Sequence, residues 1–148
     1  MDNLEQYILD NTSPEEALMH SLERETYLRV INPRMISGHL QGKLLEMLVR
    51  MMRPKRVLEI GTFTGYSALS IARGLEDDAR LDTIEVDDEL EEIAASFFVR
   101  SEYGSRIRQH IGSALDIVPQ LGEVYDMVFI DGDKREYPAY YKMLMDGG

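Results

Sequence analysis

The sequence contains no cysteine, and this absence excludes two ways of stabilising a fold. Disulfide bonds cannot form, and metal sites held by thiolates cannot be built. No apolar stretch approaches the roughly 20 residues that a helix needs to span a bilayer. The first residues, Met1 to Glu5, lack the basic and apolar regions of a secretory signal peptide. We therefore expect a cytoplasmic protein that makes no membrane contact.

Positive charge is also scarce, because 16 lysines and arginines stand against 27 aspartates and glutamates, for a formal net charge of −11. No run of basic residues with interleaved aromatic residues offsets this charge locally, so the phosphate backbone of a nucleic acid would be repelled. Nucleic acid is not an expected partner. The acidic balance is explained by solubility alone or by attraction of a cationic ligand. The 44% hydrophobic content is ordinary for a soluble globular domain with a real core.

Residues 1–53 show helical spacing and no convincing strand. Pro14 stands at a helix start, and the Asn-Pro pair at 32–33 ends that helix. Ser37 is expected to cap a second helix. We expect a helical cap that belongs to the same domain as a core at residues 54–148. The apolar residues at helical spacing are Ala17, Leu18, Leu22, Tyr27 and Leu28 in the first helix and Leu40, Leu44, Leu45, Leu48 and Met52 in the second.

Beyond residue 53, short apolar runs alternate with helical ones in four successive β-α units. Such alternation predicts a parallel sheet with right-handed crossovers. The fold class that we expect is α/β, a Rossmann-like three-layer α/β/α sandwich that is preceded by N-terminal helices and stops after the fourth unit. The expected strands are residues 57–60, 81–86, 107–111 and 127–130, and the expected helices are residues 66–75, 90–98, 115–121 and 137–144.

A glycine turn follows the first expected strand, which ends in Glu59-Ile60-Gly61. Ligands bind at the carboxyl edge of a parallel sheet, where this turn must lie. Gly61 and Gly65 would let the backbone approach a nucleotide closely, and Ser67 stands at the amino end of a helix, where donors are free. Two glycines also occur in purely structural turns, so both interpretations stay open.

Acidic residues at two strand ends bear on the ligand. Glu85 ends the second strand, where a carboxylate can accept hydrogen bonds from both ribose hydroxyls, although a solvated strand end is the simpler alternative. Glu59 would repel a pyrophosphate but suits a ligand with an ammonium and a sulfonium group, as in S-adenosylmethionine. Phe63 occupies the place of the middle glycine of a dinucleotide fingerprint. An ion pair between Glu59 and a nearby arginine remains an alternative.

Two segments resemble the catechol and caffeoyl-CoA type O-methyltransferases of class I. They are Leu58-Glu59-Ile60-Gly61-Thr62-Phe63-Thr64-Gly65-Tyr66-Ser67 and Val128-Phe129-Ile130-Asp131-Gly132-Asp133-Lys134, and the resemblance runs from about Met35 to the last residue. It implies S-adenosylmethionine as cofactor, a divalent cation such as Mg²⁺ or Ca²⁺, and a small hydroxylated acceptor, with a homodimer as a candidate assembly. The implied function is metal-assisted methyl transfer to a hydroxyl of a small phenol or diol.

The resemblance also implies roles for individual residues. Asp131 would contact the cofactor and ligate the cation, and Lys134 would act as general base toward the acceptor hydroxyl. Tyr137 and Tyr140 either flank the acceptor or pack in the core. The implied cofactor contacts are Met35, Ser37, Glu59, Gly61, Tyr66 and Ser67 around the methionine end, Glu85 on the ribose with Val86 after it, and Ser113 and Ala114 at the adenine edge.

Members of this family continue into further strands that supply an Asp-Asn pair of metal ligands. Asp131 alone cannot form a tight divalent site, so we expect a fragment of a longer protein, or less simply a chain that another chain completes. His20, His39 and His110 stand far apart and are expected at the surface or in packing. A nicotinamide-dependent oxidoreductase and a non-catalytic cofactor-binding module remain the competing hypotheses.

Overall fold

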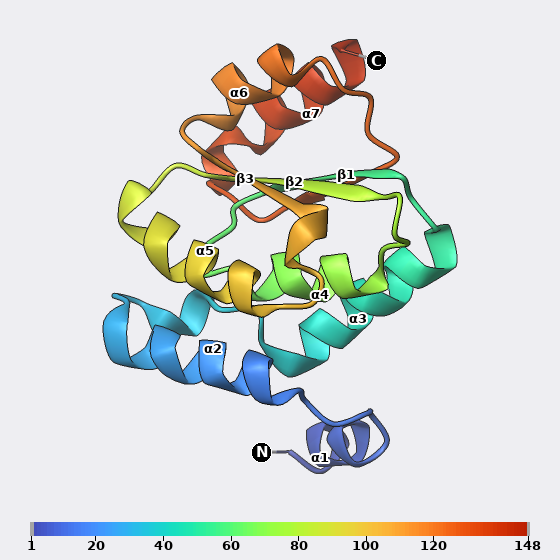
Figure 1. The fold of residues 1–148 in the computed structure, drawn as a ribbon, viewed down its shortest axis with the longest axis vertical. Helices are drawn as coiled ribbons and strands as arrows, with labels where there is room; N and C mark the ends of the chain where they lie inside the picture. Colours follow the sequence, from blue (N-terminus) through green and yellow to red (C-terminus); the bar gives the residue numbers. More distant parts are fainter. Residues whose placement is uncertain (1, 148) are drawn as a thin grey trace.

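A computed structural model describes residues 2–147 and places a four-stranded parallel sheet at the centre of the molecule (Figure 1). The strands are β1 (Arg56–Ile60), β2 (Arg80–Glu85), β3 (Ile107–Ile111) and β4 (Met127–Ile130). Their order across the sheet is β3-β2-β1-β4, and every neighbouring pair is parallel. The predicted parallel α/β sheet is thereby confirmed.

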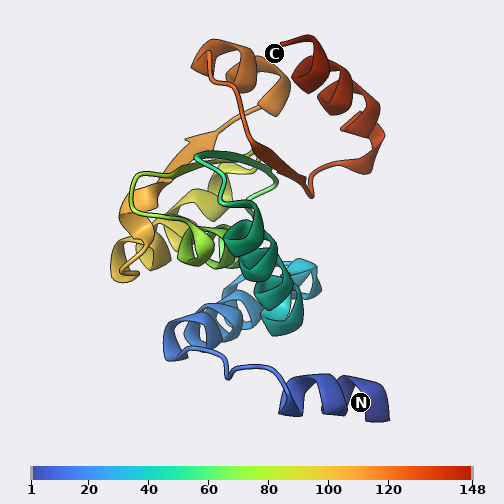
Figure 2. The ribbon, with the colours of Figure 1, turned by 90° about the vertical axis from the view of Figure 1, so that its right-hand side faces the viewer.

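Helices cover both faces of the sheet, as the prediction of three layers requires. Figures 1 and 2 show α3 (Gly38–Met52), α4 (Tyr66–Gly74) and α5 (Glu91–Arg100) on one face, with α6 (Ala114–Leu121) and α7 (Tyr137–Asp146) on the other. Four short 3₁₀ segments complete the connections: η1 (Pro33–Met35), η2 (Asp88–Leu90), η3 (Gly104–Arg106) and η4 (Lys134–Glu136).

The central strands carry apolar side chains into two separate clusters, one on each face of the sheet. Val57 and Leu81 belong to the cluster under α3, α4 and α5, whereas Leu58 and Ile84 belong to the cluster under α6 and α7. Successive side chains of a strand point to opposite faces, so β1 and β2 must be apolar on both sides. This burial fixes the register, and with it the strand ends that carry the polar residues.

The N-terminal region contains one helix more than the sequence pattern predicted. Helix α1 (Asn3–Asp10) is capped by the Asp2 carboxylate and buries no side chain, and it lies apart from the sheet in Figures 1 and 2. The expected helix after Pro14 is α2 (Ala17–Arg29), which packs on the core. Ser37 stands at the N-cap position of α3, but its side chain makes no capping hydrogen bond, so that detail of the prediction was wrong.

Candidate cofactor site

A cavity of about 1140 Å³ opens at the carboxyl ends of β1, β2 and β4. This is the edge at which parallel sheets bind ligands. Every residue that the family resemblance assigned to the cofactor or to catalysis lines this cavity, with the exception of Glu59. These lining residues are Met35, Ser37, Gly61, Tyr66, Ser67, Glu85, Val86, Ser113, Ala114, Asp131 and Lys134.

The glycine turn brings the end of β1 against the end of β4. Gly61 has a φ of 103°, and a Cβ atom on it would lie 2.4 Å from the carbonyl oxygen of Asp131. Glycine is therefore required at this position both for the positive φ and for the close approach. The Gly61 amide donates to the carbonyl oxygen of Ile84 (2.9 Å), and the Asp131 amide donates to that of Ile60 (2.8 Å). Backbone hydrogen bonds thus hold three strand ends around the cavity.

Glu85 is held at the rim of the cavity by two backbone donors. Its Oε2 accepts a hydrogen bond from the Phe63 amide (2.8 Å), and its Oε1 accepts one from the Asp87 amide (3.1 Å). Phe63 itself has a φ of 52°, a left-handed conformation that is uncommon outside glycine. Each carboxylate oxygen can accept further hydrogen bonds, so the oriented group suits a vicinal diol.

Glu59 differs from its expected position, because its side chain is fully buried beneath the turn and does not line the cavity. Its carboxylate accepts hydrogen bonds from the hydroxyls of Ser67 and Thr83, the latter at 2.6 Å. Burial raises the pKa of Glu59 to about 7, against the opposing effect of these donors. The ion pairs found among residues 2–147 do not involve Glu59, so the alternative of a pair with an arginine is not observed, whereas the cofactor contact expected of Glu59 stays a prediction.

Asp131 and Lys134 follow β4 and face the same cavity. Desolvation raises the pKa of the Asp131 carboxyl, and the nearby Lys134 ammonium opposes this rise. Asp133 is engaged elsewhere, since the Arg135 guanidinium approaches its Oδ2 to 2.6 Å and holds its pKa down to about 2. Asp131 is therefore the carboxylate after β4 that remains available to a ligand.

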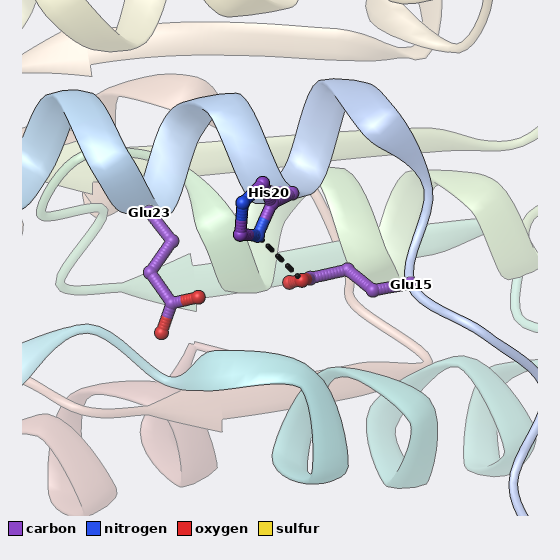
Figure 3. Close-up of side chains that lie close together, drawn as sticks. All are labelled: Glu15, His20 and Glu23. Atoms are coloured by element: carbon purple, nitrogen blue, oxygen red, sulfur yellow. Dashed lines mark ion pairs between the residues drawn. The ribbon is translucent and has the colours of Figure 1, made fainter.

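A complete divalent-cation site is not formed by the part of the chain that the structure describes. Within residues 2–147, the group of three or more His, Asp or Glu donors close enough to share one ion is Glu15, His20 and Glu23 (Figure 3). It lies outside the cavity, and its closest contact is a 3.4 Å ion pair between Glu15 Oε2 and His20 Nδ1. Ca²⁺ and Mg²⁺ take six or more oxygen ligands, of which Asp131 would supply a small part.

The three histidines lie in separate places. His39 Nε2 contacts the Ser13 carbonyl oxygen (3.0 Å), and His110 Nε2 contacts the buried Asp82 carboxylate (2.8 Å). His20 stays largely exposed on α2. None of the three lines the cavity among its described residues.

Part of the cavity wall was not predicted from the sequence. The segment after α2 contributes Val30, Ile31 and Asn32, where Asn32 has a left-handed backbone before Pro33. The Asn-Pro pair was interpreted only as the end of a helix, although it also signals a sharp change of direction. Other lining residues that were not expected at the site are Arg29, Asp87, Glu89, Leu90 and Glu136.

None of the helices in residues 2–147 combines the length and apolar composition that a membrane crossing requires.

The curated proteins described next, to which the chain is similar, are O-methyltransferases. The chain is 39% identical over 106 residues to a catechol O-methyltransferase of Niastella koreensis, which covers 69% of this chain and 48% of the relative. It is 33% identical to caffeoyl-CoA O-methyltransferase 2 of Petunia hybrida, over 98% of this chain and 63% of the relative. The matched regions therefore span 48% and 63% of the length of these two curated relatives.

Solved structures agree with this assignment. The O-methyltransferase of Streptomyces achromogenes involved in tomaymycin synthesis, in complex with SAM, superposes with a TM-score of 0.88 at 33% identity and covers 98% of this chain and 66% of its own. An SAH-bound methyltransferase of Podospora anserina gives a TM-score of 0.92 at 28% identity, covering 99% and 63%. Residues 10–147 match the family described as O-methyltransferase, and the chain therefore belongs to that family.

Proposed function

We propose that this chain is the S-adenosylmethionine-binding part of an O-methyltransferase that acts on a hydroxyl of a small phenolic or diol acceptor. The observation that carries the proposal is the convergence of Gly61, Glu85, Asp131 and Lys134 on one cavity at three strand ends.

The cavity fits the cofactor in shape and in charge. Gly61 lines the cavity at the end of β1, and the Glu85 carboxylate is oriented by the amides of Phe63 and Asp87. Carboxylates line the rim more densely than cations, which favours a ligand that carries an ammonium and a sulfonium group. When bound, the cofactor supplies a methyl carbon that is activated by positive sulfur.

The protein's own task is alignment and proton removal. Glu85 would hold the ribose end of the cofactor, and the turn at Gly61 would hold its methionine end. Lys134 would accept the proton that the acceptor hydroxyl loses on methylation, while the carbon–sulfur bond of the cofactor breaks and leaves a neutral thioether. The proton remains on the Lys134 amine until it passes to solvent.

A divalent cation is implied by the relatives of the catechol type, and Asp131 would hold it. Among the described residues, Asp131 does not belong to a group of three or more His, Asp or Glu donors close enough to share one ion. The nicotinamide alternative is disfavoured by the family match and by Phe63, whose side chain replaces the glycine that a pyrophosphate requires.

The test is transfer of a labelled methyl group from S-adenosylmethionine to catechol by the purified chain, with and without Mg²⁺. Label in the phenolic ether is the expected product, and Lys134→Ala should lose it. A chain that binds S-adenosylhomocysteine but transfers no label with or without Mg²⁺ would be a cofactor-binding module, and the catalytic part of the proposal would fail.

A further inference from the structure

Two buried hydroxyl groups connect helix α2 to the glycine turn. A hydrogen bond joins the Oγ1 atoms of Thr26 and Thr64 at 2.9 Å, and neither side chain is accessible to solvent. Thr26 donates its one hydroxyl hydrogen to the carbonyl oxygen of Leu22 (2.8 Å), one turn earlier in α2, and its oxygen is then free to accept the hydroxyl hydrogen of Thr64. The contact joins positions 38 residues apart and ties a helix of the N-terminal region to the turn between β1 and α4.

Side-chain hydrogen bonds hold the turn at two residues, Thr62 and Thr64. Thr62, its other threonine, shares a 2.6 Å hydrogen bond with Thr83 of β2. Phe63 lies between the two anchored threonines, lines the cavity and donates its amide to Glu85. The anchor at Thr62 comes from the sheet, whereas the anchor at Thr64 comes from α2. The position of Phe63 therefore depends on both.

Helix α2 also leads into a part of the cavity wall that follows it directly in the chain. Val30, Ile31 and Asn32 follow Thr26 by about one turn and line the cavity together with Met35. The Thr26–Thr64 hydrogen bond thus fixes the separation between this wall and the glycine turn. A cofactor in the cavity would contact both.

We propose that Thr26 is a positioning residue, which acts through Thr64 to hold the glycine turn in its cofactor-binding conformation. Without the Thr26 hydroxyl, the Thr64 hydroxyl stays buried without its hydrogen-bond partner on α2. Proteins avoid such a state by local rearrangement. Rearrangement at Thr64 shifts Phe63 and misaligns the amide that orients Glu85. This inference rests on the cofactor binding proposed above and adds α2 to the elements that determine affinity.

Thr26→Val tests the inference, because valine keeps the shape of the side chain and removes the hydroxyl. Thr26→Ser restores the hydroxyl, and Thr12→Val is the control, since Thr12 bonds only to the carbonyl oxygen of Ile8 at the exposed end of α1. Two quantities are measured: the affinity for S-adenosylhomocysteine and the hydrogen exchange of the Gly65 amide in the cofactor-free chain. The Gly65 amide donates to the Thr62 carbonyl oxygen (3.0 Å) and so reports the closure of the turn.

We expect Thr26→Val to weaken binding by about tenfold and to accelerate exchange at Gly65 while central β2 amides keep their protection. Thr26→Ser should restore both quantities, and Thr12→Val should change neither. In the double variant Thr26→Val with Thr64→Val, both hydroxyls are gone, so part of the lost affinity should return.

Uniformly faster exchange, or unchanged exchange at Gly65, would overturn the inference and leave Thr26 a packing residue. The exchange measurement needs no cofactor. A chain that never binds S-adenosylhomocysteine but shows local loosening at Gly65 would therefore refute the proposed function and still support positioning of the turn by Thr26.

Discussion

Gly61 and Asp131 approach each other so closely that a single methyl group between them would collide with the backbone. A Cβ atom on Gly61 would lie 2.4 Å from the carbonyl oxygen of Asp131 and 3.1 Å from the amide nitrogen of Gly132. The contact joins the turn after β1 to the segment after β4, which carries Asp131 and Lys134. The absence of a side chain on Gly61 thus allows the two halves of the candidate site to lie in contact.

Gly61→Ala should abolish measurable binding of S-adenosylhomocysteine and lower the free energy of unfolding by more than about 1 kcal/mol, because it combines a clash with an unfavourable φ. The control is Gly122→Ala, since Gly122 has a φ of 61° but nothing among residues 2–147 within 4 Å of the place that a Cβ atom would take. Calorimetry and urea denaturation check both variants. Equal affinity in the Gly61 variant and the wild type would show that the close approach is irrelevant to binding.

The buried Glu59 predicts a specific dependence of stability on pH. Its pKa is about 7 in the folded chain and near 4.5 when exposed, so the folded state retains a proton that the unfolded state loses between these values. The protonated Glu59 therefore contributes about 3 kcal/mol to the free energy of unfolding below pH 4.5. This contribution falls as the pH rises and is lost above pH 7.

Glu59→Gln removes this titration and should flatten the decline between pH 4.5 and about 7. Urea denaturation of both proteins across that range gives the difference. Curves that stay parallel would mean that Glu59 is ionised throughout and that its hydroxyl partners outweigh its burial.

Substitution of Asp82 should lower the stability of the fold and leave the cavity intact. Its buried carboxylate accepts hydrogen bonds from Arg108 (2.9 Å), His110 (2.8 Å) and Tyr125 (3.1 Å), and it does not line the cavity. Asp82→Asn should cost roughly 2 kcal/mol of unfolding free energy, because Arg108, His110 and Tyr125 lose the charge of the buried carboxylate that they share. Affinity for S-adenosylhomocysteine should stay within about twofold at temperatures where the variant is folded.

The matched control for Asp82 is Asp78→Asn, whose partner Lys55 is 2.7 Å away at an exposed site. An exposed ion pair contributes at most about 1 kcal/mol. A similar loss of stability in both variants would contradict the importance assigned to burial.

Lys134 should separate catalysis from cofactor binding. Lys134→Ala removes the proposed base and should reduce methyl transfer to catechol by at least about 100-fold, within the range of general base catalysis. The affinity for S-adenosylhomocysteine should change by less than about threefold, since the ribose and methionine contacts remain. A variant that loses affinity in proportion to its activity would make Lys134 a cofactor ligand instead.

Much of the sheet and its edge could be predicted because the strands are short apolar runs with polar residues immediately after them. Val57 and Leu58 are buried on opposite faces of the sheet as that pattern requires, and Gly61, Glu85 and Asp131 stand at the ends of three strands at one edge. Local sequence determines these positions, since the period of a strand and the end of its apolar run fix where the next polar group lies.

The tertiary details could not be predicted in the same way. Whether Glu59 faces the cavity or lies beneath the turn depends on Ser67 and Thr83, which come from other elements. In α1, Leu4, Tyr7 and Ile8 stand at helical spacing, but the helix is eight residues long and buries no side chain, so the pattern is too short to predict a packed helix. The Thr26–Thr64 contact spans 38 residues and leaves no periodic trace in the sequence.

Titration of the chain with S-adenosylhomocysteine, with and without Mg²⁺, beside Glu85→Ala tests the central claim most directly. Glu92→Ala, an exposed carboxylate in the first turn of α5, serves as the control. We predict binding by the wild type that Mg²⁺ does not alter, and at least about tenfold weaker binding by Glu85→Ala, because charged hydrogen bonds to the ribose are lost. A folded wild-type chain that binds NADH and not S-adenosylhomocysteine, or a Glu85→Ala variant with full affinity, would contradict the account.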